Sequence, residues 1–341
     1  MSQSYLGIDL HKRRSYVVLM DEGGDVLDER ALPNGDMAEY LAERVPRATT
    51  AVMEATFNWP FMYDLVSEHV ERVLLAHPQK VKLIAEATVK TDKVDAHTLT
   101  HLARTGYLPE SYAAPKWLRE LRRLMRHRQN LIADHTRHKN RIHSVLHSYN
   151  LSSPLSDLFG SKGRAFLAEL LCDPAGPLTP SACQVIEDSM AAIDFYNERI
   201  QGLDQAFSAY ARTDPAIDLL RSLPGVGLIS AITIRAELGE VERFRNGHQV
   251  ARWAGLTPKV LISDQMVRHG SITREGSTYL RQAMVSVALR AVRFSPSMRA
   301  FYQRLAKRRG SGIARVALAR KLVILSYQLL RTGQPYREGD R

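Results

Sequence analysis

The chain has 341 residues, of which 47 are Lys or Arg and 36 are Asp or Glu, so its formal net charge is +11. This length allows two or three domains, and the positive charge favours a polyanionic partner, of which nucleic acid is the simplest. Two cysteines cannot make a zinc site by themselves and fit a reducing cytoplasm. We find no signal-peptide pattern and no apolar run of the ~18 residues that a membrane span needs, so we expect a cytoplasmic protein.

Residues 4–110 alternate between short apolar runs and helical patterns. Strands are predicted at Leu6–Leu10, Tyr16–Met20, Val26–Leu32, Thr49–Met53 and Arg72–Ala76. Helices are predicted at Met37–Arg44, Phe61–Glu68, Pro78–Ala87 and Asp92–Thr105. Three strands, a helix and then alternating units are typical of a ribonuclease-H-like α/β domain.

Four carboxylates stand at the ends of these elements. Asp9 ends the first strand, Glu54 ends a later one, and Asp92 and Asp95 open a helix that Thr91 could cap. Taken singly, each acid is typical of a turn or a solvated helix face. Together they have the order that a ribonuclease-H-like metal site needs, because strand ends and a helix meet at one edge of the sheet. Hard oxygen ligands of this kind suit Mg²⁺ or Mn²⁺.

The middle of the chain predicts a helical arm after a Pro-containing boundary at Tyr107–Pro115. A long helix is expected over 116–148 and a second over about 183–212, with a connector at Leu151–Pro180 that holds a short helix. Heptad-like apolar positions suggest that the long helices form an antiparallel coiled coil, within the chain or between subunits. These positions are Leu118, Leu121, Met125, Ile132, Ile142 and Leu146, then Ile193, Tyr196, Ile200, Leu203, Phe207 and Tyr210.

The first arm helix is also densely basic and carries five histidines. His135, His138 and His143 could be metal ligands, but no Cys or acid stands at a matching spacing. We therefore favour a polar face that contacts phosphates.

The C-terminal part is predicted to be mainly helical. Leu223-Pro224-Gly225-Val226-Gly227 followed by a helical pattern resembles a helix-hairpin-helix, although an ordinary tight turn is the alternative. A polar loop is expected around 263–277. From Gly276 to Arg337 there is no acid, which makes this helical tail a strong electrostatic footprint.

Six short motifs follow one another along the chain. They are Gly7-Ile8-Asp9, Met53-Glu54-Ala55-Thr56, Thr91-Asp92-Lys93-Val94-Asp95-Ala96, Pro224-Gly225-Val226-Gly227, Ala254-Gly255-Leu256-Thr257-Pro258 and Gly270-Ser271-Ile272-Thr273-Arg274-Glu275-Gly276. In this order they resemble the motifs of the transposases of insertion-sequence family one-ten, relatives of the Piv-type DNA invertases. The resemblance implies a RuvC-like DEDD catalytic domain at 1–110, a coiled-coil arm at 111–212 with its connector at 151–182, and a C-terminal transposase domain at 213–341.

The resemblance also implies an activity, that of a DNA transposase or site-specific recombinase. In that family a serine of the C-terminal domain attacks the phosphodiester and forms a covalent phosphoserine, and its position corresponds here to Ser263. Composition alone does not choose among Ser263, Ser271 and Ser277. Mg²⁺, for which Mn²⁺ can substitute, would be held by the catalytic acids, which are Asp9, Glu54, Asp92 and Asp95.

The implied partners are donor and target double-stranded DNA and a structured bridge RNA that pairs with both. The implied protein is bacterial, nucleoid-associated and homo-oligomeric, as a dimer or a tetramer. The competing function is a metal-dependent nuclease of the Holliday-junction-resolvase type, in which the same acids activate water and no serine is needed. A catalytically inert nucleic-acid scaffold is a third reading, which the intact acid quartet disfavours.

Overall fold

The computed structural model describes residues 3–84, 91–263 and 266–339, with only the main chain described at 260–263 and 266–269. The chain divides into two compact units, Met1–Ala114 and Pro115–Arg341. This division falls in the predicted Pro-containing boundary. Each unit is described by itself below.

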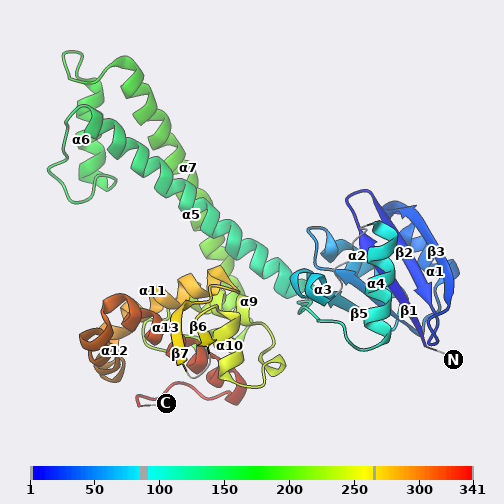
Figure 1. Cartoon of the computed structure of the whole chain (residues 1–341). Coiled ribbons are helices and arrows are strands. Elements are labelled where there is room, and N and C mark those ends of the chain that lie inside the picture. Colours follow the sequence, from blue (N-terminus) through cyan, green and yellow to red (C-terminus); the bar gives the residue numbers. More distant parts are fainter. Residues whose placement is uncertain (1–2, 85–90, 264–265, 340–341) are drawn as a thin grey trace. The chain divides into compact units, whose positions relative to one another are not determined.

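The first unit is a mixed five-stranded sheet with helices on both faces, in the strand order β3-β2-β1-β4-β5 (Figure 1). β1 pairs antiparallel with β2 and parallel with β4. The strands are β1 (Ser4–Leu10), β2 (Arg14–Met20), β3 (Val26–Pro33), β4 (Thr49–Glu54) and β5 (Arg72–Ala76). The helices are the 3₁₀ turn η1 (Asn34–Asp36), α1 (Met37–Arg44), α2 (Trp59–His69), α3 (Pro78–Ile84) and α4 (Asp92–Arg104).

The strands and helices predicted for this unit are confirmed, with shifts of a few residues at their ends. The last three residues of the predicted helix Pro78–Ala87 lie outside the described residues. The architecture is compatible with the predicted RuvC-like fold.

Strand alternation assigns each face of the sheet to its own helices. Leu6, Ile8 and Leu10 of β1 are buried in one core with residues of α1 and α2. The residues between them, Gly7 and Asp9, therefore point to the other face. There Val52 of β4 is buried against α4 in a second core. The side chain of Asp9 thus lies on the face of the sheet that α4 covers.

Gly7 lets α4 lie directly on β1. A Cβ atom at Gly7 would lie 2.1 Å from Thr100 Oγ1 and 2.4 Å from the carbonyl oxygen of Ala96. Four residues of a helix advance about 6 Å and two residues of a strand about 6.6 Å. Since Ala96 lies over Gly7, Asp92 lies one turn away, over Asp9. The missing side chain at Gly7 therefore positions the acids of the helix.

The second unit begins with two long helices that run side by side, α5 (Lys116–Ser148) and α7 (Pro180–Ala211) (Figure 1). The 33 residues of α5 span about 50 Å. At one end of the pair, the short helix α6 (Ser161–Cys172) closes a small core with both long helices. The two predicted arm helices are confirmed; α7 begins three residues early because Thr179 caps it by accepting the Ala182 N–H. Supercoiling of the pair stays a prediction.

The predicted apolar seam is right in α7 and wrong at one position in α5. Ile132 is 37% exposed, and its neighbour Leu131 is buried instead. The seam passes through Leu131 because polar residues on either side also face α7. Arg128 forms an ion pair with Asp204, and the ring of His138 lies 5.7 Å from that of Tyr196.

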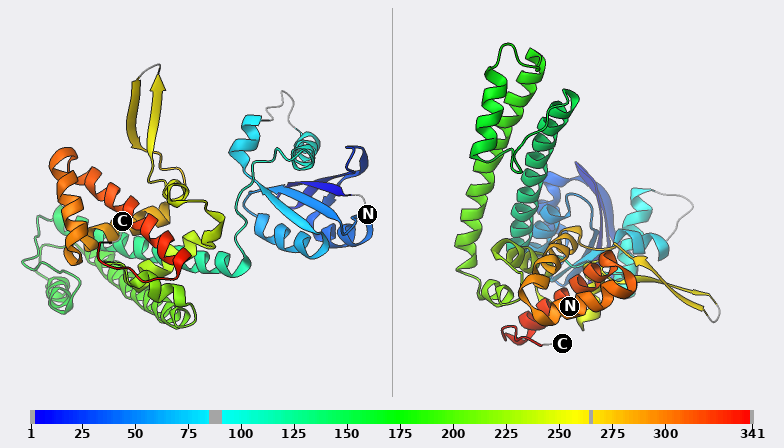
Figure 2. Two further views of the ribbon diagram at one scale, coloured as in Figure 1. Left: turned by 90° about the horizontal axis from the view of Figure 1, so that it is seen from below. Right: turned by 90° about the vertical axis from the view of Figure 1, so that its left-hand side faces the viewer.

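The remainder of the second unit is a helical core with one β-hairpin. Its elements are α8 (Pro215–Arg221), α9 (Leu228–Leu238), η2 (Val241–Arg243), α10 (Gly247–Trp253), β6 (Pro258–Ser263), β7 (Met266–Ile272), α11 (Thr278–Phe294), α12 (Pro296–Arg309) and α13 (Ser311–Thr332). The expected polar loop at 263–277 is therefore wrong in its first half, where β7 pairs with β6. Figure 2 shows this hairpin, in yellow, reaching out from the helices of its unit.

The turn between α8 and α9 has the predicted Pro-Gly-Val-Gly sequence between two helices. Gly225 has a φ of +82°, and a Cβ atom there would lie 2.7 Å from the Ala291 nitrogen of α11. This glycine therefore serves packing within the protein. Around Gly227 nothing lies within 4 Å of a Cβ position. Its phosphate-binding role stays a prediction.

The buried carboxylate of Glu237 joins the arm to the helical core. Glu237 on α9 is 3% exposed and lies 3.1 Å from the guanidinium of Arg126 on α5. Arg122 donates to the carbonyl oxygens of Ala236 and Glu237. Some arm arginines that were expected to contact phosphates therefore hold the arm in place instead.

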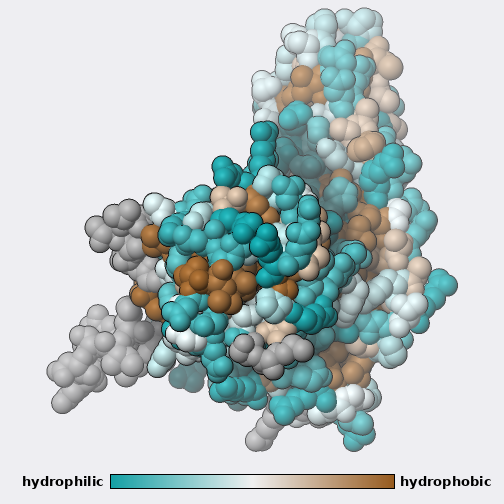
Figure 3. Space-filling view, turned by 90° about the vertical axis from the view of Figure 1, so that its right-hand side faces the viewer, coloured by the Kyte–Doolittle hydropathy of each residue, from teal (hydrophilic) through white to brown (hydrophobic). Residues whose placement is uncertain are grey.

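Most of the surface in Figure 3 is hydrophilic, with several separate apolar patches. Among the described helices, none is both long and apolar enough to cross a bilayer.

We predict that Gly7→Ala loosens the contact between β1 and α4. The new methyl group meets main-chain atoms that cannot rotate away, so the penalty should reach about 3 kcal/mol, the upper end for overpacking. Hydrogen–deuterium exchange of the β1 and α4 amides should speed up about a hundredfold. Gly35→Ala is the matched control, because nothing lies within 4 Å of a Cβ atom there. Equal exchange in the two variants would refute a close approach at Gly7.

Candidate functional site

The sheet places two of the predicted acids side by side. Asp9 stands one residue before the end of β1, and Glu54 ends β4. The parallel register pairs Ile8 with Met53, so Asp9 and Glu54 are neighbours on adjacent strands and point to the same face. This is the face that α4 covers.

The other two acids come from the first turn of α4. Thr91 has an extended backbone, and its hydroxyl accepts the Val94 N–H at 3.2 Å, so the predicted cap is confirmed and the helix begins at Asp92. Asp95 follows three residues later on the same side of the helix. Carboxylates in this position interact favourably with the positive end of the helix dipole.

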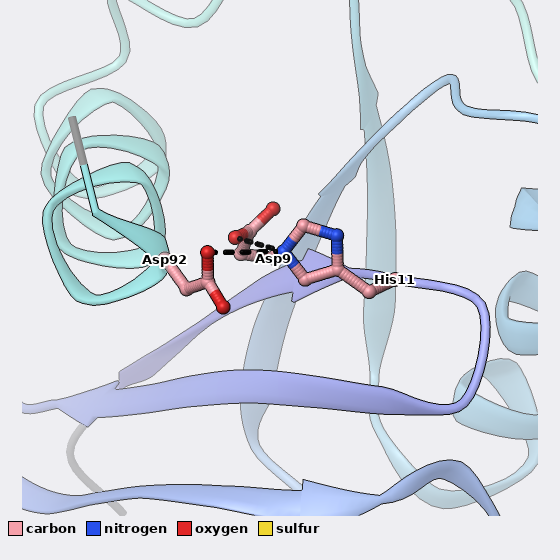
Figure 4. Close-up of side chains that lie close together, drawn as sticks. All are labelled: Asp9, His11 and Asp92. Carbon is pink, nitrogen blue, oxygen red and sulfur yellow. Dashed lines mark ion pairs between the residues drawn. The ribbon is translucent and has the colours of Figure 1, made fainter.

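His11 completes the cluster and was not predicted as a site residue. Its Nε2 atom lies 3.2 Å from Asp9 Oδ2 and 3.1 Å from Asp92 Oδ1, as Figure 4 shows. The side-chain amides of Asn34 and Asn58 both donate to the carbonyl oxygen of His11, at 2.9 and 3.0 Å. The imidazole is thus held between a strand acid and a helix acid. Within the described residues, this trio is the only group of three His, Cys or acidic residues with ligand atoms within 4.8 Å of one another.

The electrostatics of Asp9 reflect both burial and crowding. Its pKa is raised from 3.8 to about 6, chiefly by burial and also by the charges of Asp92, Asp95 and Glu54, while the nearby His11 works in the opposite direction. The other three predicted acids are therefore close enough to Asp9 to act on it. A carboxyl group with a pKa of about 6 is ionised above that pH at a free-energy cost, and a positive charge nearby would offset this cost.

The donor atoms fit a divalent cation. Asp9 Oδ2 is buried and accepts no hydrogen bond from any described residue, and His11 approaches it without hydrogen-bond geometry. Carboxylate oxygens are the donors that Mg²⁺ and Mn²⁺ prefer, and an imidazole nitrogen is compatible with Mn²⁺. Asp9, Glu54, Asp92 and Asp95 could hold such ions, with His11 as a further donor.

The three candidate serines lie in different environments. Ser277 caps α11, accepting the Leu280 N–H at 3.0 Å and donating to Glu237 at 2.9 Å, so its hydroxyl is already used in the fold. Ser271 is exposed in β7. Ser263 ends β6 in the hairpin, opposite Met266, and its side chain is outside the described atoms. Ser263 and the acids belong to different units.

The mixed sheet and its acid cluster are compatible with the RuvC-like class of nucleic-acid enzymes. Comparisons with known proteins give the family. A family model for DEDD-type transposases matches residues 6–151, and a second, described as the IS116/IS110/IS902 transposase family, matches residues 217–303. The chain belongs to the IS110/IS116/IS902 family of transposases, which are enzymes of DNA transposition and therefore act on DNA.

Individual relatives agree along the full length of the chain. A probable family 20 transposase of Pseudomonas aeruginosa is 28% identical over 99% of this chain and 100% of its own length. The transposase for insertion sequence element IS1111A of Coxiella burnetii is 25% identical over 98% of this chain and 91% of its own. The predicted family is confirmed.

We predict that Asp9→Asn stabilises the cation-free protein at high pH. A carboxyl group whose pKa is raised from 3.8 to about 6 in the folded state costs up to about 3 kcal/mol when ionised. The amide avoids that cost, so in EDTA at about pH 8 the variant should unfold at a higher temperature than the wild type. The gain should vanish as the pH falls from 6 to about 4, where wild-type Asp9 takes up its proton.

Adding Mg²⁺ should reverse the ranking, because cations stabilise only the protein that binds them. Asp36→Asn is a control at an exposed carboxyl group and should melt like the wild type under all conditions. If the wild type and Asp9→Asn melted at the same temperature in EDTA at both pH values, ionised Asp9 would not lower the free energy of unfolding.

Proposed function

We propose that this chain is the recombinase of an insertion sequence, which cuts and rejoins DNA through Ser263 and a covalent phosphoserine, with Mg²⁺ held by the acid cluster. The observation that carries the metal-dependent part is the convergence of three carboxylates, Glu54, Asp92 and Asp95, on Asp9, whose pKa rises to about 6. The assignment of the serine rests on the family motif that ends in Pro258. The substrates would be a donor and a target DNA duplex.

The reaction would be a transesterification. The Ser263 Oγ attacks phosphorus, the Oγ–P bond forms, and the bond from phosphorus to the leaving sugar oxygen breaks. The hydroxyl proton leaves to solvent or a nearby base, and the leaving oxygen gains a proton. Bound divalent cations supply positive charge to the phosphate and favour the deprotonated hydroxyl. The chain's own contribution is to hold those ions through Asp9, Glu54, Asp92 and Asp95 and to present the serine.

Basic side chains outside the acid cluster support a long nucleic-acid contact. From Gly276 to Arg337 no acid offsets them. Lys307, Arg308 and Arg309 are all exposed at the end of α12. Arg123, Arg137 and Arg141 are exposed along α5. We propose that these surfaces also bind a structured bridge RNA, whose base pairing would select the DNA while the protein holds backbones. A homo-oligomer, as a dimer or a tetramer, would bring the DNA ends together.

The serine assignment predicts a covalent product. Wild-type protein incubated with Mg²⁺, its guide RNA and DNA of the element ends should yield a DNA–protein adduct on a denaturing gel. Ser263→Ala should abolish it. Ser271→Ala and Ser277→Ala are the matched controls and should keep it, although loss of the Ser277 cap should lower the free energy of unfolding by about 1 kcal/mol. An adduct formed by Ser263→Ala would overturn the assignment, and free nicks without an adduct would favour the resolvase-type nuclease.

The acid cluster predicts loss of cleavage without loss of binding. Asp9→Asn, Glu54→Gln, Asp92→Asn and Asp95→Asn should each slow cleavage by more than about a hundredfold, since even residues that only orient metal ligands cost 10–100-fold. DNA affinity, measured with Ca²⁺ in place of Mg²⁺, should change little. Asp36→Asn should cleave normally. Wild-type rates for Asp9→Asn would show that the metal site lies elsewhere.

The proposed bridge RNA should copurify with the protein. Purified protein should carry a structured RNA transcribed from the flank of its own element, identifiable by sequencing. Nuclease treatment should abolish recombination, and adding the RNA back should restore it. Full activity of RNA-free protein on purified DNA would refute the guide.

A further inference from the structure

Two phenylalanine side chains lie in solvent at the start of α2. Phe57 is 75% exposed and Phe61 is 60% exposed. The other aromatic residues of this segment behave differently: Trp59 and Tyr63 pack against the core, with ring centroids 5.6 Å apart in an edge-to-face arrangement. The segment therefore buries two aromatic rings and leaves two others exposed.

Phe57 lies in the loop that holds His11, and Phe61 lies four residues later, at the start of α2. Phe57 follows Glu54 by three residues and is the direct neighbour of Asn58. The Asn58 amide donates to the carbonyl oxygen of His11 at 3.0 Å, and the His11 ring contacts Asp9 and Asp92. The loop with Phe57 is thus tied to the acid cluster by one hydrogen bond.

The charge around this loop selects the kind of partner. Lys12 and Arg13 follow His11 in the turn between β1 and β2, Arg14 begins β2, and all three residues are exposed. Asn34, the other residue that holds His11, also donates its main-chain N–H to the carbonyl oxygen of Arg13. Basic side chains bind the phosphates of a nucleic-acid strand, and exposed aromatic rings stack on its bases.

The size of the apolar surface excludes a stable protein partner. Two aromatic side chains bury about 150–250 Å² each, whereas a stable interface takes about 800 Å² from each partner. A pair of flat rings is, in contrast, sufficient to stack on one or two bases.

We propose that Phe57 and Phe61 stack on unpaired bases of the DNA strand whose phosphate lies at the acid cluster. The inference rests on the proposed function, since it takes the acid cluster as the place of cleavage. Bases inside a duplex are stacked on one another, so the rings can act only where the strand is opened. The two residues would hold an opened strand in place next to the scissile phosphate.

Photo-crosslinking of the full-length protein tests this directly. The probe is an oligothymidylate that carries one 5-iodouracil, bound in Ca²⁺ so that no cleavage occurs. After irradiation, the adduct should map to Phe57 or Phe61 by mass spectrometry, and the same iodouracil within a duplex should give none there. Adducts that map only to other residues would overturn the proposal.

Affinity at raised salt gives a second measurement, because salt weakens phosphate contacts and leaves stacking. The double variant Phe57→Ala/Phe61→Ala should bind the oligothymidylate about tenfold more weakly, in the range expected for loss of a stacked base. Phe57→Trp should bind the oligothymidylate as the wild type does, whereas Phe57→Leu should bind it as weakly as Phe57→Ala. This comparison of Phe57→Trp with Phe57→Leu separates stacking from simple apolar contact. Tyr107→Ala is the matched control, since Tyr107 is also 75% exposed and follows the end of α4 remote from Asp92.

The outcomes separate this inference from the proposed function. If the wild type cleaves DNA and the double variant binds oligothymidylate as tightly as the wild type, stacking is refuted and the proposed function is not. Equal rescue by Phe57→Leu also refutes stacking. Wild-type protein that neither binds nor cleaves DNA refutes both.

Discussion

The close approach of α4 to β1 at Gly7 is the contact on which the acid cluster depends. Without a side chain at Gly7, the helix backbone can rest on the strand, 2.4 Å from where a Cβ atom would be. One helical turn then matches two strand residues, so Asp92 reaches Asp9. The parallel register of β1 with β4 adds Glu54 from the side. Three separate segments of the chain thereby deliver carboxylates to one place.

That convergence is unfavourable in the free protein. Asp9 is partly buried among like charges, and the His11 imidazole lies 3.2 Å from its Oδ2 atom. The surrounding fold offsets the remaining repulsion between the carboxylates. It supplies an apolar core on one face of the sheet, a capped helix on the other, and two side-chain amides that bind the His11 main chain. A rigid scaffold therefore keeps together acids that would otherwise separate, which is the condition for tight binding of a cation.

Much of this was predictable because it is local. Alternating apolar patterns gave the strands and helices of the first unit, and the order of Asp9, Glu54, Asp92 and Asp95 gave the acid cluster. His11 was missed because a histidine in a basic turn has no spacing signal; only the fold brings it to Asp92. The β6–β7 hairpin was missed because Asp264-Gln265 is not a typical two-residue turn sequence. Leu131 replaced Ile132 in the arm because polar partners on α7, invisible in the sequence of α5, set the seam.

The buried Glu237 has a consequence for how such proteins can be recombined as modules. Its carboxylate is satisfied by Arg126 from the arm and by Ser277 from the start of α11, so groups about 150 positions apart in sequence share one buried charge. A chimera joined near residue 212 would combine a Glu237 from one parent with an Arg126 from another, and any mismatch would leave a charge buried alone. A junction between Ala114 and Pro115 keeps Arg126, Glu237 and Ser277 in the same parent. Exchange between relatives should therefore succeed with the arm and helical core moved as a single cassette.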